Sequence, residues 1–459
     1  MEQHRAAVRG TYRNGSWTRR SVLAGLSAAA GTVGLASAAC GGASGTPEAA
    51  APKQLKSGVT IQWGIENGPQ NRFDLRSKQT QMFEAKFPGI KVDQVVNGSD
   101  INKIKAMMAA GTPYDLIRIT TTQYAGFANQ RSLVALDELI RRDRYDLKDF
   151  FPAAIAQWQW RGKQWAMPFL GVLTAYVNTT IVERSGARKP PNTWKDPTWT
   201  NEAFLEFCRK CTRQEGGKTV QFGFTGTHDN WCYYMPWVWA NGGDMFDKDF
   251  KAVTLGDPPG LEGIQFLGDL ITKHHVAPTP DELKELGGSG KPFQDGKTAM
   301  MAGSVNAVAT NRAVANLRWT VTAYPRGRKG IAMGGGGVGW FITAGSKNRD
   351  ETWELLKVVL APDSDKLTAL SGEAPPSRRS VANDPEFLSP KEAPGSDMKV
   401  VVEALETALH TDAVLIQGDE IFGIMATELA PIWTGERSAR ESLEAIKQRV
   451  TPMLALERG

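Results

Sequence analysis

Five large aromatic side chains lie within nine residues of the chain, at Trp231, Tyr233, Tyr234, Trp237 and Trp239. Trp231, Tyr234 and Trp237 are spaced three apart, so on a helix they would share one face. Aromatic rings can stack on the apolar C–H faces of sugar rings, whose hydroxyl groups then bond to carboxylates and amides. The same spacing is typical of a helix that packs into a core, and the sequence leaves both interpretations open.

A polar segment with two glycines, residues 241–244, follows these aromatic residues directly. Gly242 and Gly243 allow a ligand to approach the backbone closely, and Asp244 supplies a carboxylate acceptor beside them. Together with the aromatic residues, this segment favours a polyhydroxylated ligand.

Two segments of the sequence look like cofactor-binding motifs, but neither meets the requirements of its motif. Gly334, Gly336 and Gly339 satisfy G-x-G-x-x-G, yet the apolar residues that follow continue as a strand, whereas a dinucleotide site would open a helix there. The phosphate-loop pattern also fails, because Gly290 lies one residue too far from the Gly-Lys-Thr tail that contains Lys297. We therefore expect no cofactor.

Catalytic and metal-binding patterns are also missing from the sequence. His274 and His275 are adjacent and diverge on a regular element, and there is no G-x-S-x-G nucleophile elbow. We expect no metal and no enzymatic activity. A sequence does not show which carboxylates converge in space, so an exported carbohydrate-active enzyme that uses cleft carboxylates is the alternative.

Three internal cysteines, Cys208, Cys211 and Cys232, allow at most one internal disulfide. Cys208 and Cys211 share one face of an expected helix, where simple burial is favoured over a redox pair. A bridge from Cys232 to one of the two stays open, since an oxidising compartment would permit it.

The charge of the chain is concentrated near its start. The 459 residues include 54 basic and 49 acidic side chains, but residues 1–39 hold five arginines and one glutamate, which leaves 49 basic and 48 acidic residues in the rest. A body so close to neutral does not favour nucleic-acid binding. Its 41% apolar and 22% charged content is that of a soluble globular protein.

Residues 1–39 are predicted to be an export signal. Arg19 and Arg20 precede an uncharged Ala/Gly-rich run, as in twin-arginine signals, and this run is too weakly apolar to favour a transmembrane anchor. Residues 37–40 (SAAC) resemble a lipobox, so Cys40 is predicted to be acylated. Ordinary cleavage after small residues, leaving Cys40 unmodified, is the alternative. Residues 40–57 are predicted to be a flexible tether.

The body begins with alternating strands and helices. Periodicity predicts strands at 59–65, 90–96 and 114–119, with helices at 71–87 and 101–110 between them. This order implies parallel strands with crossover helices, hence an α/β lobe. Ligands bind such sheets beyond the carboxyl ends of the strands, which here means residues 66–70 and 120–123.

A second α/β unit is predicted to begin near residue 171. It contains strands at 172–178 and 219–224 and a helix at 201–213. Residues 338–343 predict a further apolar strand, and the chain from Arg349 on is expected to be predominantly helical.

Short motifs spread over the body resemble a known family. They include residues 164–169 (QWAMPF), 190–194 (PPNTW), 240–246 (ANGGDMF), 293–300 (FQDGKTAM) and 433–436 (WTGE). In this order and spacing they resemble the sugar-type solute-binding proteins of ABC importers, the group with maltose- and glycerol-phosphate-binding proteins. Val305 departs from the family pattern, which commonly has tryptophan after the Gly-Ser pair.

The resemblance implies a two-lobed, type II periplasmic-binding-protein-like α/β fold with a cleft between lobes joined by hinge strands. The lobes would comprise residues 58–170 plus 343–375, and residues 176–338 plus 376–459. It further implies a monomer that captures a sugar, oligosaccharide or glycerol derivative, closes on it, and delivers it to ABC permease subunits. The protein would be lipid-anchored to the outer face of a bacterial membrane.

Ten residues are predicted to contact the ligand. Some follow a strand, some could stack on a sugar ring or accept hydrogen bonds from it, and others match the pocket of the family. The ten are Glu66, Asn67, Gln123, Phe169, Trp231, Trp237, Asp244, Asn306, Gly336 and Arg378.

Overall fold

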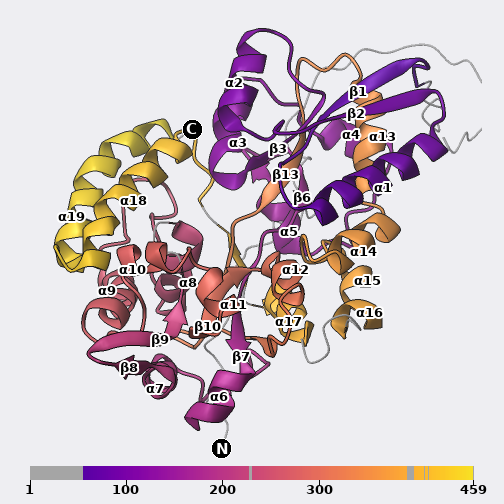
Figure 1. Ribbon diagram of the computed structural model, residues 1–459. Helices are drawn as coiled ribbons and strands as arrows, with labels where there is room; N and C mark the ends of the chain where they lie inside the picture. The colour runs from indigo at the N-terminus through magenta and orange to yellow at the C-terminus, as the bar shows by residue number, and fades with distance from the viewer. Residues whose placement is uncertain (1–54, 227–229, 390–396, 408, 412, 458–459) are drawn as a thin grey trace, which may run out of the picture. The chain divides into compact units, whose positions relative to one another are not determined.

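Two five-stranded sheets form the framework of the protein (Figure 1). The computed structural model describes residues 55–226, 230–389, 397–407, 409–411 and 413–457. The predicted export signal, Cys40 and the tether as far as residue 54 lie outside the described residues. The last tether residues, 55–57, contact the body, where the Lys56 backbone N–H donates to Glu351 Oε1 at 2.7 Å.

The first sheet has the strand order β2-β1-β3-β13-β6. Strands β1, β2 and β3 are parallel, and β13 is antiparallel to both β3 and β6. The bounds are β1 (Val59–Gly64), β2 (Ile90–Val95), β3 (Leu116–Thr120), β6 (Met167–Phe169) and β13 (Val338–Ile342). The crossover helices α1 (Gln70–Lys86) and α2 (Ile101–Ala109) confirm the predicted order of strands and helices.

The second sheet has the order β11-β7-β10-β9-β8. Its strands are β7 (Leu173–Asn178), β8 (Arg213–Glu215), β9 (Lys218–Thr225), β10 (Thr298–Ser304) and β11 (Trp319–Thr322). Strand β10 is parallel to β9 but antiparallel to β7, so this sheet is mixed. The sequence anticipates β7 and β9 closely.

The chain passes from one sheet to the other at two neighbouring places. Strand β6 leads through residues 170–172 into β7, and β12 (Met333–Gly335) leads through Gly336 and Gly337 into β13. Strand β12 pairs in parallel with β14 (Leu409–Thr411). The two passages touch, because a Cβ atom on Gly171 would overlap the carbonyl oxygen of Gly336. Glycine at this position therefore permits the close approach of the two backbones.

Helices cover both sheets. In Figure 1, α18 and α19 lie beside α9, and α13 packs along α1. The remaining helices are α3 (Thr121–Asn129), α4 (Asp137–Arg142), α5 (Pro152–Ala156), α6 (Thr179–Ser185), α7 (Asn201–Cys211), α8 (Trp231–Ala240), α9 (Pro258–Thr272), α10 (Pro280–Glu285), α11 (Lys291–Gln294), α12 (Ala307–Arg312), α13 (Arg349–Val359), α14 (Pro362–Leu370), α15 (Arg379–Ala382), α16 (Pro385–Leu388), α17 (Lys399–Thr407), α18 (Gly418–Thr434) and α19 (Ala439–Val450), with a short hairpin of β4 (Gln159–Trp160) and β5 (Lys163–Gln164) and a closing 3₁₀ turn, η1 (Thr451–Leu456).

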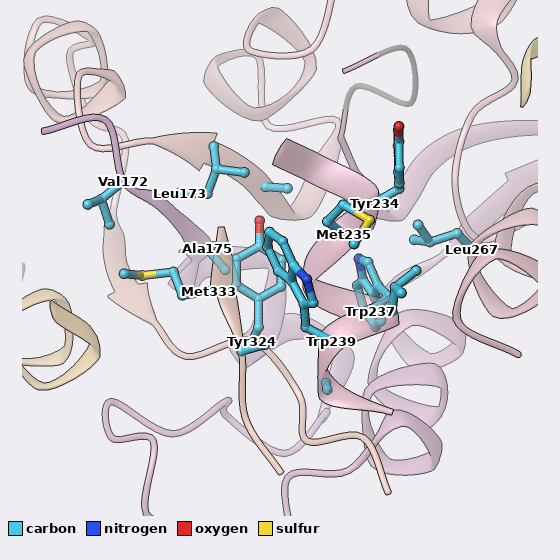
Figure 2. Packing of buried hydrophobic residues seen from close by; sticks show 14 of the residues in the cluster. Val172, Leu173, Ala175, Tyr234, Met235, Trp237, Trp239, Leu267, Tyr324 and Met333 are labelled. Carbon is cyan, nitrogen blue, oxygen red and sulfur yellow. The ribbon is translucent and has the colours of Figure 1, made fainter. Parts of the chain in front are cut away.

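Each sheet has its own hydrophobic core. Around the first sheet, Trp63 and Trp340 meet edge to face at 5.4 Å between ring centroids. Around the second, Figure 2 shows the side chains of α8 packed against Leu267 of α9 and Tyr324. None of the helices in the described residues is long and apolar enough to cross a lipid bilayer.

Candidate ligand-binding site

A cavity of about 540 Å³ lies where elements from both sheets converge. This volume is in the range of small-molecule sites. Its walls come from the end of β3 and the start of α3, the start of α8, the second passage between the sheets, and the start of α18. The lining residues are Thr120, Thr121, Thr122, Asn230, Trp231, Cys232, Tyr233, Gly336, Gly337, Val338, Asp419 and Phe422.

Three helices begin at this cavity. Thr120 and Gln123 form a capping box at the start of α3, and Asn230 caps α8 by accepting from the Cys232 backbone N–H at 3.1 Å. The third helix, α18, starts at Gly418. The N-terminal end of a helix carries a partial positive charge and unpaired N–H groups, so these ends favour ligands rich in oxygen lone pairs.

Aromatic rings form the apolar part of the wall. The ring centroids of Trp231 and Phe422 lie 5.8 Å apart. Trp239 packs edge to face against Trp231, with 6.3 Å between ring centroids. Tyr233 adds a third ring to the lining. Three threonines and three aromatic residues therefore border one space, a combination that suits the binding of a polyhydroxylated ring.

The passage between the sheets lies directly against α8. A Cβ atom on Gly336 would overlap the Cys232 sulfur and would lie 3.2 Å from Cζ2 of Trp231. A side chain at this position would displace the tryptophan or the strand, so glycine holds the backbone and the aromatic wall together.

Asp419 is the one charged residue among the described residues that line the cavity. Its carboxylate lies 3.6 Å from Lys105 Nζ, in a pair whose side chains are 45% and 55% exposed. Hydrolysis of a glycosidic bond needs two carboxylates across the scissile bond, and a single lining carboxylate does not provide them. The described residues also contain no group of three or more His, Cys, Asp or Glu placed to hold a metal ion.

Three of the ten predicted ligand contacts lie at or beside this cavity. Trp231 and Gly336 line it. Gln123 lines an adjacent cavity of about 230 Å³, which shares Thr122 and Asp419 with the first. The predicted segment 120–123, beyond the end of β3, thus supplies walls to both cavities.

Glu66 and Phe169 instead belong to a buried ionic cluster beyond the end of β1. Glu66 is 6% exposed, and its Oε1 lies 2.8 Å from Arg76 Nη2 and 2.6 Å from Arg118 Nη1. The ring of Phe169 lies under the guanidinium of Arg118, 4.5 Å from its centroid. Burial opposes the charge of Glu66, but the two arginines outweigh it and lower its pKa to about 2. Neighbouring Asn67 is exposed, and its carbonyl accepts from Arg72.

Trp237 and Asp244 make contacts that stabilise the fold. Trp237 is 4% exposed and packs against Phe204, Phe266 and Tyr324. Figure 2 labels Trp237 and Tyr324 in this core. Asp244 Oδ1 accepts a 3.2 Å hydrogen bond from Trp239 Nε1, so this carboxylate holds the ring that supports Trp231. Neither residue lines the cavity.

Arg378 and Asn306 also lie away from the cavity walls. Arg378 is buried, donates to Asp149, Tyr145 and the Leu360 carbonyl, and covers the Phe150 ring at 4.1 Å. Its guanidinium is therefore occupied by the fold. Asn306 is exposed just before α12.

Cys208, Cys211 and Cys232 form no disulfide in the structure. Cys208 and Cys211 are buried on one face of α7, as simple burial predicts, and burial raises the pKa of both thiols. Their thiolate forms are disfavoured, which argues against a redox pair.

Seven residues of the wall were not predicted as ligand contacts: Asn230, Cys232, Tyr233, Gly337, Val338, Asp419 and Phe422. Asp419 and Phe422 are three residues apart on the first turns of α18, so they share a face. That spacing was visible in the sequence, but nothing local indicated that this face meets α3 and α8.

Two sheets joined by two passages, with a polar and aromatic cavity beside them, define a two-lobed binding-protein fold. Residues 78–395 match the model of the bacterial extracellular solute-binding protein family, and the chain belongs to this family. Its members act outside the cytoplasm, as their description states.

Known proteins resemble the chain in sequence and in fold. The diacetylchitobiose binding protein DasA of Streptomyces coelicolor is 25% identical over 354 residues, which cover 75% of this chain and 78% of DasA. The substrate-binding protein Lmo0181 of Listeria monocytogenes, solved with cycloalternan, has a TM-score of 0.76 at 16% identity, covering 87% of this chain and 99% of that one. UgpB of Mycobacterium tuberculosis, solved with glycerophosphocholine, has a TM-score of 0.72 at 19% identity, covering 86% and 98%.

These matches confirm the predicted fold class and family. All of them are binding proteins, and none favours the carbohydrate-active enzyme that the sequence left as an alternative.

Proposed function

We propose that this protein is the substrate-binding lipoprotein of an ABC importer for a sugar, an oligosaccharide or a glycerol derivative. The observation that carries the proposal is the 540 Å³ cavity, which the aromatic residues Trp231, Tyr233 and Phe422 line together with Thr120, Thr121 and Thr122. Apolar faces beside hydrogen-bonding groups match the two sides of a sugar ring.

The ligands of similar proteins support this class. Diacetylchitobiose and cycloalternan are oligosaccharides, and glycerophosphocholine is a glycerol derivative.

Capture would proceed by closure of two lobes, residues 58–170 plus 343–375 and residues 176–338 plus 376–459. The two passages near Gly171 and Gly336, together with the third crossing that these bounds put at residues 375–376, would act as the hinge, and a ligand that contacts both lobes would stabilise the closed form. The closed monomer would then deliver its ligand to the permease subunits.

Export and anchoring complete the proposal. The twin-arginine signal in residues 1–39 would direct the chain across the membrane, and acylation of Cys40 would hold it at the outer face. Mass spectrometry of the mature N-terminus tests this: a diacylated Cys40 is expected, and an unmodified Cys40 would contradict the lipid anchor.

The ligand class is tested by calorimetry with maltose, maltotriose, N,N′-diacetylchitobiose, glycerol and glycerophosphocholine. At least one saccharide is expected to bind reversibly, without any product, and to change tryptophan fluorescence through Trp231. The absence of binding by every compound would overturn the ligand class, and turnover of a glycan would favour an enzyme.

A further inference from the structure

The second cavity, of about 230 Å³, continues the first. Thr122 and Asp419 line both, so the two spaces adjoin at these two residues. Its volume is below the range typical of a complete ligand site. It therefore suits an extension of a ligand that already occupies the larger cavity.

The walls of the second cavity carry the chemistry of a sugar site. Three amide side chains, Gln123, Gln130 and Gln417, border it, and Phe127 contributes an apolar surface. Primary amides both donate and accept, so they suit hydroxyl groups, which also do both. The Gln123 Oε1 accepts a hydrogen bond from the Thr120 backbone N–H, and this bond fixes the orientation of the Gln123 amide group.

The shape of this second cavity is fixed by backbone contacts. Cβ atoms on Gly126 and Gly418 would collide with the carbonyl oxygens of Ile416 and Thr122, respectively, so α3 and the start of α18 approach at glycines. The Glu457 carboxylate accepts from the backbone N–H groups of Ile416 at 2.8 Å and Gln417 at 3.1 Å. A wall held in this way is formed before any ligand arrives.

We propose that the second cavity is a subsite for one further ring of an oligosaccharide whose other rings occupy the main cavity. This inference rests on the proposed function and adds the length of the ligand. The Lys105–Asp419 pair marks the junction, where its exposed groups remain available to the hydroxyls of the bridging ring. The chain thus prefers oligosaccharides of three or more units to disaccharides.

Titration calorimetry with maltose, maltotriose and maltotetraose, and with the N-acetylated chitin oligomers of two to four units, tests the length preference. In the series that binds, the Kd should fall about tenfold at the step that fills the second cavity, as one well-placed ring contributes about 1.4 kcal/mol. Equal affinity for all lengths would overturn the subsite but leave the proposed function standing. No binding by either series would overturn the subsite, and it would overturn the proposed function as well only if glycerol and glycerophosphocholine also failed to bind.

A matched pair of variants locates the effect. Gln130→Trp places a large ring in the second cavity, whereas Asn129→Trp adds the same ring at the neighbouring exposed position, which does not line it. Gln130→Trp should abolish the gain with chain length and leave disaccharide affinity unchanged, and Asn129→Trp should retain the gain. Retention of the gain in Gln130→Trp, with folding verified by circular dichroism, would overturn the proposal.

Discussion

The ends of two neighbouring strands in the first sheet have opposite characters. Beyond β1, Glu66 is paired with the guanidinium groups of Arg76 and Arg118, which themselves lie over the rings of Trp340 and Phe169. Beyond β3, Thr120 to Thr122 face a cavity. Both ends were predicted as ligand-binding edges by the same topological rule, but of the two only the second borders the 540 Å³ cavity, where the Thr120 and Thr122 hydroxyl groups already bond to each other at 2.9 Å.

The difference follows from the energetics of buried charge. Removing a carboxylate from water is costly unless an opposite charge replaces its hydration, so Glu66 at 6% exposure is bound by arginines that the fold supplies. Hydroxyl groups and aromatic faces carry no such requirement, and they can line an open space until a ligand arrives. The role of Glu66 as a ligand contact stays a prediction, which the substitution of this residue tests.

Breaking the ionic cluster should have the largest effect on the molecule. Glu66→Leu leaves Arg76, which is fully buried, and Arg118 without their counter-charge, and we expect a loss of about 3–5 kcal/mol in the free energy of unfolding. Urea denaturation followed by tryptophan fluorescence measures it. Glu215→Leu, which removes an exposed partner of Arg213, is the control and should change stability by less than about 0.5 kcal/mol. A stable Glu66→Leu protein that no longer binds would show that Glu66 contacts the ligand.

A fall in pH should weaken the same ionic cluster. The pKa of Glu66 is about 2 in the folded protein against 4.5 ordinarily, because of Arg76 and Arg118. A lowered pKa means that the unfolded chain takes up the proton first, so this stabilisation is complete above pH 4.5 and is lost as the pH falls toward 2. The difference corresponds to about 3 kcal/mol. Glu66→Gln should therefore show a shallower fall in urea midpoint between pH 6 and 3 than the native protein. Parallel curves would contradict the assignment.

Substitution in the cavity should separate binding from stability. Trp231→Leu removes a ring from the wall, and we expect ligand affinity to fall about 30-fold, or about 2 kcal/mol. Trp237→Leu is the matched control on the same helix, because its ring packs against Phe204, Phe266 and Tyr324. It should lower the melting temperature more than Trp231→Leu does and leave the Kd of the folded protein unchanged. The reverse pattern would assign Trp237 to the ligand.

A smaller effect is expected where the passage meets α8. Gly336→Ala introduces a methyl group against the Cys232 sulfur and Trp231, so about 1 kcal/mol of binding should be lost as the ring shifts. Calorimetry measures this change. Gly423→Ala, on α18 with no atom within 4 Å of the added Cβ, should bind normally and be slightly more stable. Equal affinity in both variants would mean that the ring position is unimportant.

The exposed ion pair should contribute least. Lys105→Ala removes the partner of Asp419, and with both side chains about half exposed the free energy of unfolding should change by less than about 0.5 kcal/mol. Urea denaturation of Lys105→Ala and Glu66→Leu under the same conditions compares their free energies of unfolding. A loss comparable to that of Glu66→Leu would mean that the cavity also depends on a structural charge.

The fold was largely predictable, because it rests on local periodicity. The strand–helix order from β1 to β3, the apolar β13 and the helical C-terminal part all follow from spacing along the chain, and the family motifs agree with the topology. The partners of side chains were not predictable in this way. Nothing near Arg378 indicates that Asp149 and Tyr145, more than 200 residues earlier, bind it. Trp231 and Trp237 look alike in sequence, but only Trp231 lies at the helix start that meets the passage.

Three helices, α3, α8 and α18, begin at the main cavity. A peptide dipole gains or loses no proton in ordinary surroundings, and no histidine is among the described residues that line this space. A protein outside the cytoplasm works in a medium whose acidity the cell does not regulate. The partial charge of a helix end and the face of an aromatic ring do not change with pH, whereas an imidazole changes its charge between about pH 5 and 8. Ligand binding through these helix ends and rings is therefore expected to change little over that pH range.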